Sequence, residues 1–420
     1  MKKNFGIAFV TGRKHFQNVL KTYFRNWIEH DLISNKEISL HLFVVYDVDY
    51  SGALASDFRS VPGEISSLLD SVHFYGSGEI DDEKQRLISE GVVDSREADL
   101  VFGGGYAGLR NVALHFALQK KMDRLLFIDD DEYPIATVRS GPNELRWIGQ
   151  SIVKTHFEYS QQADITNGLH CGYISPFPYV SLDEGLRTED FRLFVEAISN
   201  DIISWQNVKR TTIDNFGVTY ADEEILDQRT ATEVSEVNGM KFISGANLCF
   251  NFERSSTPPV FYNPPGARGE DAFMSTMLST KRVLRVPCYT FHDAFSEYGH
   301  VLDGVLPQQL APVEARSPSV VNRFVKAAIG WVRYKPLLTY VTQRSNYERV
   351  IGQAMANLEM TVPRFVEYFG TRKFEEIVPE FQQYHENVSD HFRNLEQTKL
   401  AWSRLLPKNR PDFAQVLAAF

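Results

Sequence analysis

Short apolar runs alternate with amphipathic stretches over the first three hundred residues. The runs at 5–10, 38–46 and 125–128 are too short for core helices and predict buried strands. Between the first two, residues 16–30 carry apolar side chains at helical spacing. The expected buried face of that helix consists of Val19, Leu20, Tyr23, Phe24 and Ile28. Alternating strands and helices predict an α/β fold built on a largely parallel sheet.

The pattern changes along the chain. Further strands are predicted at 72–75, 240–250 and 283–291, and a strand with a following loop at 163–180. A helix follows the glycines at 103–105. The charged segment 76–98 is expected to be a loop with a surface helix, and 181–238 to be an acidic, partly helical insertion. After residue 312 only helical patterns remain. We therefore expect an α/β domain at 1–311, containing the insertion, and an all-α domain at 312–420.

Composition excludes several classes of partner. The chain has 420 residues, and its net charge of −10 argues against a nucleic-acid backbone or an anionic membrane as the main partner. Its three cysteines lack a Cys-x-x-Cys pairing, so we expect neither a disulfide framework nor a zinc site. No apolar run approaches the roughly 20 residues of a membrane helix. We expect a cytoplasmic protein, and interpret the apolar segment 330–341 as a packing face rather than an interfacial membrane helix.

The strand at 125–128 ends in the acids Asp129, Asp130, Asp131 and Glu132. Open α/β sheets bind ligands at the carboxyl ends of their strands, where these side chains are expected. Carboxylates two residues apart on an extended chain point the same way, so Asp129 and Asp131 are predicted to converge on one hard cation. The alternative is an acidic turn without further function.

Other polar residues are predicted at the same edge of the sheet. Thr11 and Arg13 follow the first strand, and Asp47 and Asp49 follow the second. The glycine loop ending at Gly105 opens a helix, whose free N–H groups suit a phosphate or diphosphate. A plain turn is the alternative for this loop.

A second acidic pair, Glu270 and Asp271, is predicted at the start of a helix. An ordinary acidic helix cap is the alternative, and in either case the helix dipole is expected to lower the pKa of Asp271. His292 directly follows the strand at 283–291, where it is either a ligand or a structural histidine.

Together these residues resemble GT-A fold glycosyltransferases, most closely the large inverting family of bacterial sugar transferases, over roughly residues 4–300. The Asp-x-Asp motif of that family is matched at 129–131, and its glycine loop is matched at 105–111, with Leu109 in place of alanine. Its Gly-Gly-x-Asn-like strand is matched at 244–247, and its Gly-Glu-Asp helix start is matched at 269–271. The separated acids Asp47 and Asp49 and the long insertion depart from the family pattern. The resemblance implies a GT-A fold, a Rossmann-like nucleotide-binding mixed sheet flanked by helices.

The resemblance also implies roles for these residues. It assigns Mn²⁺ or Mg²⁺ to Asp131, Asp129 and His292, and the base that activates the acceptor to Asp271, beside Glu270. Its donor-binding residues would be Thr11, Arg13, Asp47, Asp49, Gly105, Arg110, Asp129 and Asp130. The implied reaction moves a sugar, with inversion, from a nucleoside diphosphate sugar, expected to be a UDP-sugar, to a hydroxyl of a carbohydrate or other acceptor. A homo-oligomer is possible on this reading.

Two other functions remain open. A sugar-phosphate nucleotidyltransferase shares the nucleotide-binding half, but it would carry a Gly- and Arg-rich loop after the first strand, and residues 11–14 match that loop poorly. A non-catalytic carbohydrate-binding protein would not need both the acids at 129–131 and Asp271.

Overall fold

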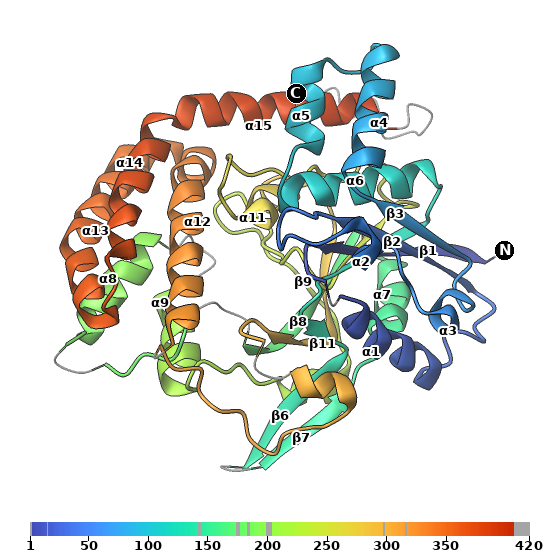
Figure 1. Ribbon diagram of the computed structural model, residues 1–420, viewed down its shortest axis with the longest axis horizontal. Helices are drawn as coiled ribbons and strands as arrows, with labels where there is room; N and C mark the ends of the chain where they lie inside the picture. The colour runs from blue at the N-terminus through green and yellow to red at the C-terminus, as the bar shows by residue number, and fades with distance from the viewer. Residues whose placement is uncertain are drawn as a thin grey trace.

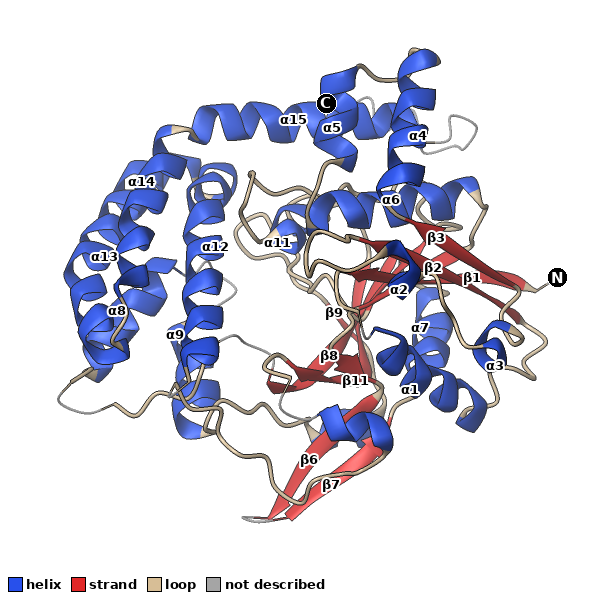
Figure 2. Ribbon diagram, in the orientation of Figure 1, coloured by secondary structure: helices blue, strands red, loops and turns tan. Residues whose placement is uncertain are grey.

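The main sheet is mixed, as Figures 1 and 2 show. The computed structural model describes residues 2–14, 16–141, 144–173, 177–182, 185–198, 204–296, 299–315 and 317–406. Within these ranges the strand order is β3-β2-β1-β4-β10-β8-β11-β5, with β9 paired to β11. The first four strands in this order are β3 (Ser71–Tyr75), β2 (Ile38–Tyr46), β1 (Lys3–Thr11) and β4 (Arg124–Ile128), and they run parallel. Their apolar runs are buried on both faces, which confirms the strands predicted at 5–10, 38–46 and 125–128.

The second half of the sheet breaks the parallel pattern. Strand β10 (Leu248–Asn251) runs antiparallel to β4 and to β8 (Ile165–Tyr173), and β11 (Val283–Asp293) runs parallel to β8. The two-residue strands β5 (Glu132–Tyr133) and β9 (Thr232–Glu233) pair with β11, and β6 (Ile135–Gly141) and β7 (Glu144–Gly149) form a separate ribbon. The acids after β4 therefore lie near the end of β11, because β5 follows them directly.

Helices cover both faces of the sheet. On one face α1 (Phe16–Glu29) and α7 (Ile152–Ser160) pack in one apolar cluster with β1 and β2. On the other, α4 (Ser77–Ser89), α5 (Ser95–Phe102) and α6 (Tyr106–Gln119) share a second cluster. The remaining short elements are α2 (Ala55–Phe58), α3 (Gly63–Ser66), α9 (Trp205–Val208), the π-helix η1 (Lys209–Asp214), α10 (Glu223–Gln228) and the 3₁₀ turn η2 (Gly299–Asp303).

Two local predictions are corrected. Segment 76–98 holds α4 and the start of α5 rather than mainly a loop, and a capping box begins α5: Asp94 accepts from the Glu97 amide at 2.8 Å, and Glu97 accepts from the Asp94 amide at 3.0 Å. On α1, Ile28 is 49% exposed and Trp27 is buried in its place. The helical period was right, and Val19, Leu20 and Tyr23 are buried as predicted; the buried face differs at its C-terminal end.

The strand predicted at 240–250 begins only at Leu248. Asn247 takes a positive φ of 47° and turns its side-chain amide toward the backbone carbonyls of Leu169 and Cys288, at 3.2 and 3.4 Å. A Cβ on Gly168 would lie 2.0 Å from that amide nitrogen, so only glycine fits opposite it. At Asn247 these side-chain hydrogen bonds replace the backbone bonds of a strand, so β10 begins only after this residue.

The C-terminal helices form an aromatic core of their own. They are α12 (Pro318–Thr342), α13 (Tyr347–Phe369), α14 (Ile377–Glu386) and α15 (Val388–Leu405), joined by the short 3₁₀ turns η3 (Arg344–Asn346) and η4 (Arg372–Glu376). Helix α8 (Thr188–Ile198), from the predicted insertion, packs against α13, with the Phe194 and Phe365 rings 3.8 Å apart. Trp331 on α12 is buried, which confirms the packing interpretation of 330–341. In the described part of the chain, no helix is long and apolar enough to cross a membrane.

Helix α12 docks closely on the loop that enters α11 (Glu270–Ser275). Arg268 donates its backbone N–H to the carbonyl of Gly330 at 3.2 Å, and a Cβ on Gly330 would lie 2.7 Å from the Arg268 side chain. Gly269 has a φ of 95° and lies against the Tyr334 ring. Figure 1 shows α15 extending from α14 to α5, where Trp402 donates to the Pro258 carbonyl at 2.8 Å. The helical region thus holds the acidic start of α11 in place, while its boundary at 312 stays a prediction.

Candidate functional site

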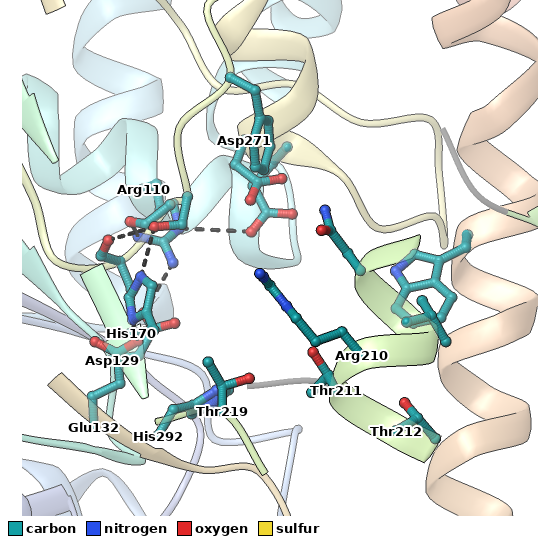
Figure 3. Close-up of a pocket in the computed structure, with 18 residues that line it drawn as sticks. Arg110, Asp129, Glu132, His170, Arg210, Thr211, Thr212, Thr219, Asp271 and His292 are labelled. Carbon is teal, nitrogen blue, oxygen red and sulfur yellow. Dashed lines mark hydrogen bonds and ion pairs between the residues drawn. The ribbon is translucent and has the colours of Figure 1, made fainter. Parts of the chain in front are cut away.

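A cavity of about 470 Å³ lies between the sheet and the helical region. Asp129, His170 and His292 line it from the sheet side, and Glu270 and Asp271 from the start of α11. Figure 3 shows Arg210, on η1, reaching into the cavity from the side opposite Arg110 and Asp129. The cavity therefore brings together residues that are far apart in the sequence.

Arg110 joins the two acidic groups. Its guanidinium, 4% exposed, contacts Asp129 at 2.9 Å and Glu270 at 3.6 Å, and it donates to the carbonyl of Gly245. The side chain comes from α6, so the helix that follows the glycine loop reaches both the acidic turn and α11. The structure thus pairs Arg110, which the resemblance assigns to donor binding, with acids beside the cavity.

The acids after β4 do not converge as predicted. Residues 129–131 form a turn rather than an extended segment, so the alternation of side chains is lost. Asp129 faces Arg110, while Asp130 and Asp131 share the guanidinium of Arg13 at 3.1 and 2.9 Å. Asp131 also contacts His292 Nε2 at 3.3 Å. Asp131 is therefore the acid beside His292, and Asp129 faces the guanidinium of Arg110 instead.

The carboxyl groups of this turn differ in charge state. Burial raises the pKa of Asp129 to about 6 and that of Asp130 to about 7, although Arg110 and Arg13 oppose the rise. Burial would raise the pKa of Asp131 as well, but His292 and Arg13 hold it well below its usual range. Burial disfavours an imidazolium, yet the Asp131 carboxylate raises the pKa of His292 to about 9. At neutral pH an ionised Asp131 therefore faces a protonated His292.

The donor atoms here suit a hard divalent cation. Asp131 offers an oxygen and His292 a nitrogen 3.3 Å apart, and Mn²⁺ or Mg²⁺ completes its shell with substrate phosphates and water. Protonated His292 supplies the positive charge beside Asp131, and its proton would be released when a metal binds there. Within the described residues, no three His, Cys, Asp or Glu side chains form a metal-binding group by themselves. The two residues fit a site that a phosphate-bearing substrate completes.

Asp271 is the second acid with an altered pKa. Gly269 is the N-cap of α11, so Asp271 sits at the second helical position and is not the cap. Burial and the neighbouring Glu270 raise the pKa of Asp271 to about 7, which corrects the expectation that the helix dipole lowers it. Helix α11 has six residues, and its small dipole does not offset the loss of water. Asp271 therefore titrates near neutrality, as a general base at this pH requires.

Arg110 and Asp129 line the cavity, whereas the other residues predicted to bind the donor lie outside it, at the neighbouring strand ends and at the start of α6. Thr11 donates to Asp130, and its carbonyl accepts the Asp47 amide at 3.0 Å. The Asp47 carboxylate accepts the amide of Asp49, which is exposed. Gly105, with a φ of 88°, is the N-cap of α6. The structure brings Thr11, Arg13 and Asp130 into contact and leaves Asp49 and Gly105 at the surface.

The sequence did not identify several residues of the cavity. Glu132 contacts His170 Nδ1 at 3.0 Å, and His170 Nε2 lies 2.8 Å from Ser244 Oγ, forming a polar chain along the cavity wall. Glu132 extends the acidic run and could have been included on that signal. Arg210 and Thr211 lie in the predicted insertion, and no local pattern marks them, because only tertiary packing carries η1 to the cavity.

The fold and the cavity define a mixed α/β protein with an acidic site at one edge of its sheet. A scan against models of known protein families finds no match for the chain, and no curated protein has a significantly similar sequence. The residues of the site are therefore what indicates a function for this protein.

Proposed function

We propose that the protein is a metal-dependent glycosyltransferase that moves a sugar from a nucleoside diphosphate sugar, with UDP as the expected carrier, to an acceptor hydroxyl. One observation supports this most: a single cavity is lined by Asp129 and His292 on the sheet side and by Asp271 on α11. Arg110 spans the two sides through Asp129 and Glu270. This arrangement offers an electrophile site and a separate base within one cavity.

The proposed chemistry divides between these groups. A divalent cation held by Asp131 and His292 would supply positive charge to the leaving diphosphate. Asp271 would accept the proton of the acceptor hydroxyl as its oxygen attacks the anomeric carbon from the face opposite the leaving group, which inverts the configuration. Arg110 orients Asp129 and Glu270 and keeps both carboxylates compensated. The parallel order β3-β2-β1-β4, with polar residues at its strand ends, supports a nucleotide-binding half of GT-A type.

The contacts of Arg13 weigh against a nucleotidyltransferase. Its guanidinium is held by Asp130 and Asp131, so it is not free to bind a triphosphate. Incubation with a UDP-sugar and Mn²⁺ should give sugar transfer or slow donor hydrolysis. Product formation from a nucleoside triphosphate and a sugar phosphate, with no use of UDP-sugars, would favour the rival activity.

Replacing Asp131 with asparagine is expected to abolish most of the Mn²⁺-dependent gain in UDP affinity. A neutral amide is a much weaker ligand for a hard cation, so UDP binding in Mn²⁺ should weaken by roughly tenfold or more, equivalent to about 1.4 kcal/mol. Isothermal titration calorimetry with UDP, with and without Mn²⁺, measures this difference. Asp82→Asn, at an exposed position on α4, is the matched control. Equal UDP affinity in the two variants would contradict the metal assignment.

A further inference from the structure

A second cavity, of about 350 Å³, lies at the N-terminal end of α12 and carries no assigned role. Three cationic side chains line it: Arg268 from the loop before α11, and Arg323 and Lys326 from α12. Tyr50 and Phe295 complete its walls from the loops after β2 and β11. The C-terminal helix thus forms part of a basic pocket beside the α/β half.

In the part of the chain that the structure describes, the positive charges of this pocket lack an ion-paired acid. Among the described residues, no carboxylate forms an ion pair with Arg268, Arg323 or Lys326. Arg323 Nε is buried and has no hydrogen-bond partner in that part of the chain, and the guanidinium lies 5.8 Å from the centre of the Phe295 ring. Arg323 is partly buried, so leaving its Nε without a partner costs desolvation free energy, which a bound anion would offset.

The pocket adjoins the proposed reaction centre. Burial lowers the pKa of Arg323, Asp131 opposes this fall, and Arg13 and Arg268 add to it, so the guanidinium lies within electrostatic reach of the acidic turn. Tyr50 packs directly on Gly12, next to Arg13. Ser319 lies in the first turn of α12, which contains no acidic residue, so the positive end of a 25-residue helix adds to the field.

We propose that this pocket binds a phosphate group of a substrate, through Arg268, Arg323 and Lys326. Guanidinium groups bind phosphate oxygens bidentately, and a cavity of this size accommodates a phosphate with part of the group that carries it. The phosphate belongs either to the acceptor or to the donor diphosphate. The acceptor is favoured, because the cation held by Asp131 and His292 already serves the diphosphate. Only this choice of acceptor rests on the proposed function; phosphate binding itself does not.

Calorimetry on the full chain tests the proposal, with inorganic phosphate as the probe. Arg323→Gln and Lys326→Gln should each weaken phosphate binding by roughly tenfold, the size of one lost charge-assisted hydrogen bond. Lys326 is exposed, so its substitution does not threaten folding, and Arg349→Gln on the exposed face of α13 is the matched control. If both pocket variants bind phosphate as tightly as the control does, or if the parent binds none, the proposal is wrong.

A second titration distinguishes the two sources of the phosphate. With UDP and Mn²⁺ at saturation, an acceptor site should still bind inorganic phosphate, and Arg323→Gln should leave UDP affinity unchanged. Competition between UDP and phosphate, together with weaker UDP binding in Arg323→Gln, would assign the pocket to the donor diphosphate. Neither measurement requires sugar transfer, so failure of the proposed function and failure of the phosphate site are separate results.

Discussion

The Asp271→Asn variant is expected to lose roughly 10²–10⁴-fold in turnover, the contribution of a positioned general base. An amide cannot accept the acceptor proton, while Asp131 and His292, which serve the donor, keep their contacts. UDP affinity in Mn²⁺ should therefore stay nearly unchanged. Initial rates of transfer or donor hydrolysis, measured beside UDP titrations on the same preparation, check both parts. A loss of UDP affinity equal to the loss of turnover would show that Asp271 acts in donor binding rather than in proton transfer.

The pH profile of the parent provides a further test of the same residue. With the pKa of Asp271 raised to about 7 by burial and Glu270, turnover should fall below neutrality as the base becomes protonated. The pKa of Asp271 is higher in the folded protein than in the unfolded chain. Its protonated carboxyl group therefore contributes to the free energy of unfolding in full below about pH 4, and this contribution is lost as the pH rises through 7. Asp271→Asn should be insensitive to this loss, so its stability relative to the parent should increase between pH 4 and pH 8.

The control for Asp271 is its neighbour. Glu270→Gln keeps the size of the side chain and removes a carboxylate that contacts Arg110 at 3.6 Å, so it should reduce turnover by less than Asp271→Asn does. If Asp271 only supported the start of α11, its asparagine variant would lose about 1 kcal/mol of stability at every pH and little activity. Product of retained anomeric configuration, by NMR, would exclude the inverting mechanism.

Replacing Arg110 with methionine is expected to destabilise the fold by about 3–5 kcal/mol. Methionine preserves packing against Phe127 and Phe261, whose rings lie 5.4 and 5.7 Å from the guanidinium. The cost comes from the carboxylates of Asp129 and Glu270, which would lose their shared cation in a poorly solvated cavity. Because Asp129 keeps a third of its side-chain exposure, the lower end of the range is expected.

Urea unfolding of the parent and the variant measures this change through the midpoint and the slope. The destabilisation should be smaller at pH 5 than at pH 8, since burial raises the pKa of Asp129 to about 6 and its protonated carboxyl group needs no cation. Arg333→Met is the matched control: Arg333 binds Glu380 at 2.8 Å, but both side chains are about a quarter exposed, so about 1 kcal/mol or less is expected. Equal losses in the two variants would show that Arg110 acts only through packing.

Local signals explain which elements the sequence predicted well. Strand β4 follows from four apolar residues between charged neighbours, and α1 from its helical spacing, because burial on the sheet favours these patterns wherever they occur. The structure also places Asp131 beside His292, although they are 161 positions apart in the sequence. Asp131 follows β4 and His292 lies at the end of β11, and these strand ends meet at one edge of the sheet. The prediction of a strand at 240–250 was wrong before Leu248. There the Asn247 side chain forms hydrogen bonds in place of backbone strand pairing, and hydrophobic spacing gives no signal of this.

The sequence by itself determined the strands β1, β2 and β4, the acids that follow β4 and the helices after residue 312, since each depends on the order of neighbouring residues. Only the tertiary structure decided which charges meet: Arg13 with Asp130 and Asp131, Arg110 with Asp129 and Glu270, and Arg210 with the cavity. It also decided the pKa of Asp271, because burial depends on what the rest of the chain places over a residue and outweighed the local helix dipole. Electrostatics at a site arises from long-range packing, and packing is absent from local sequence patterns.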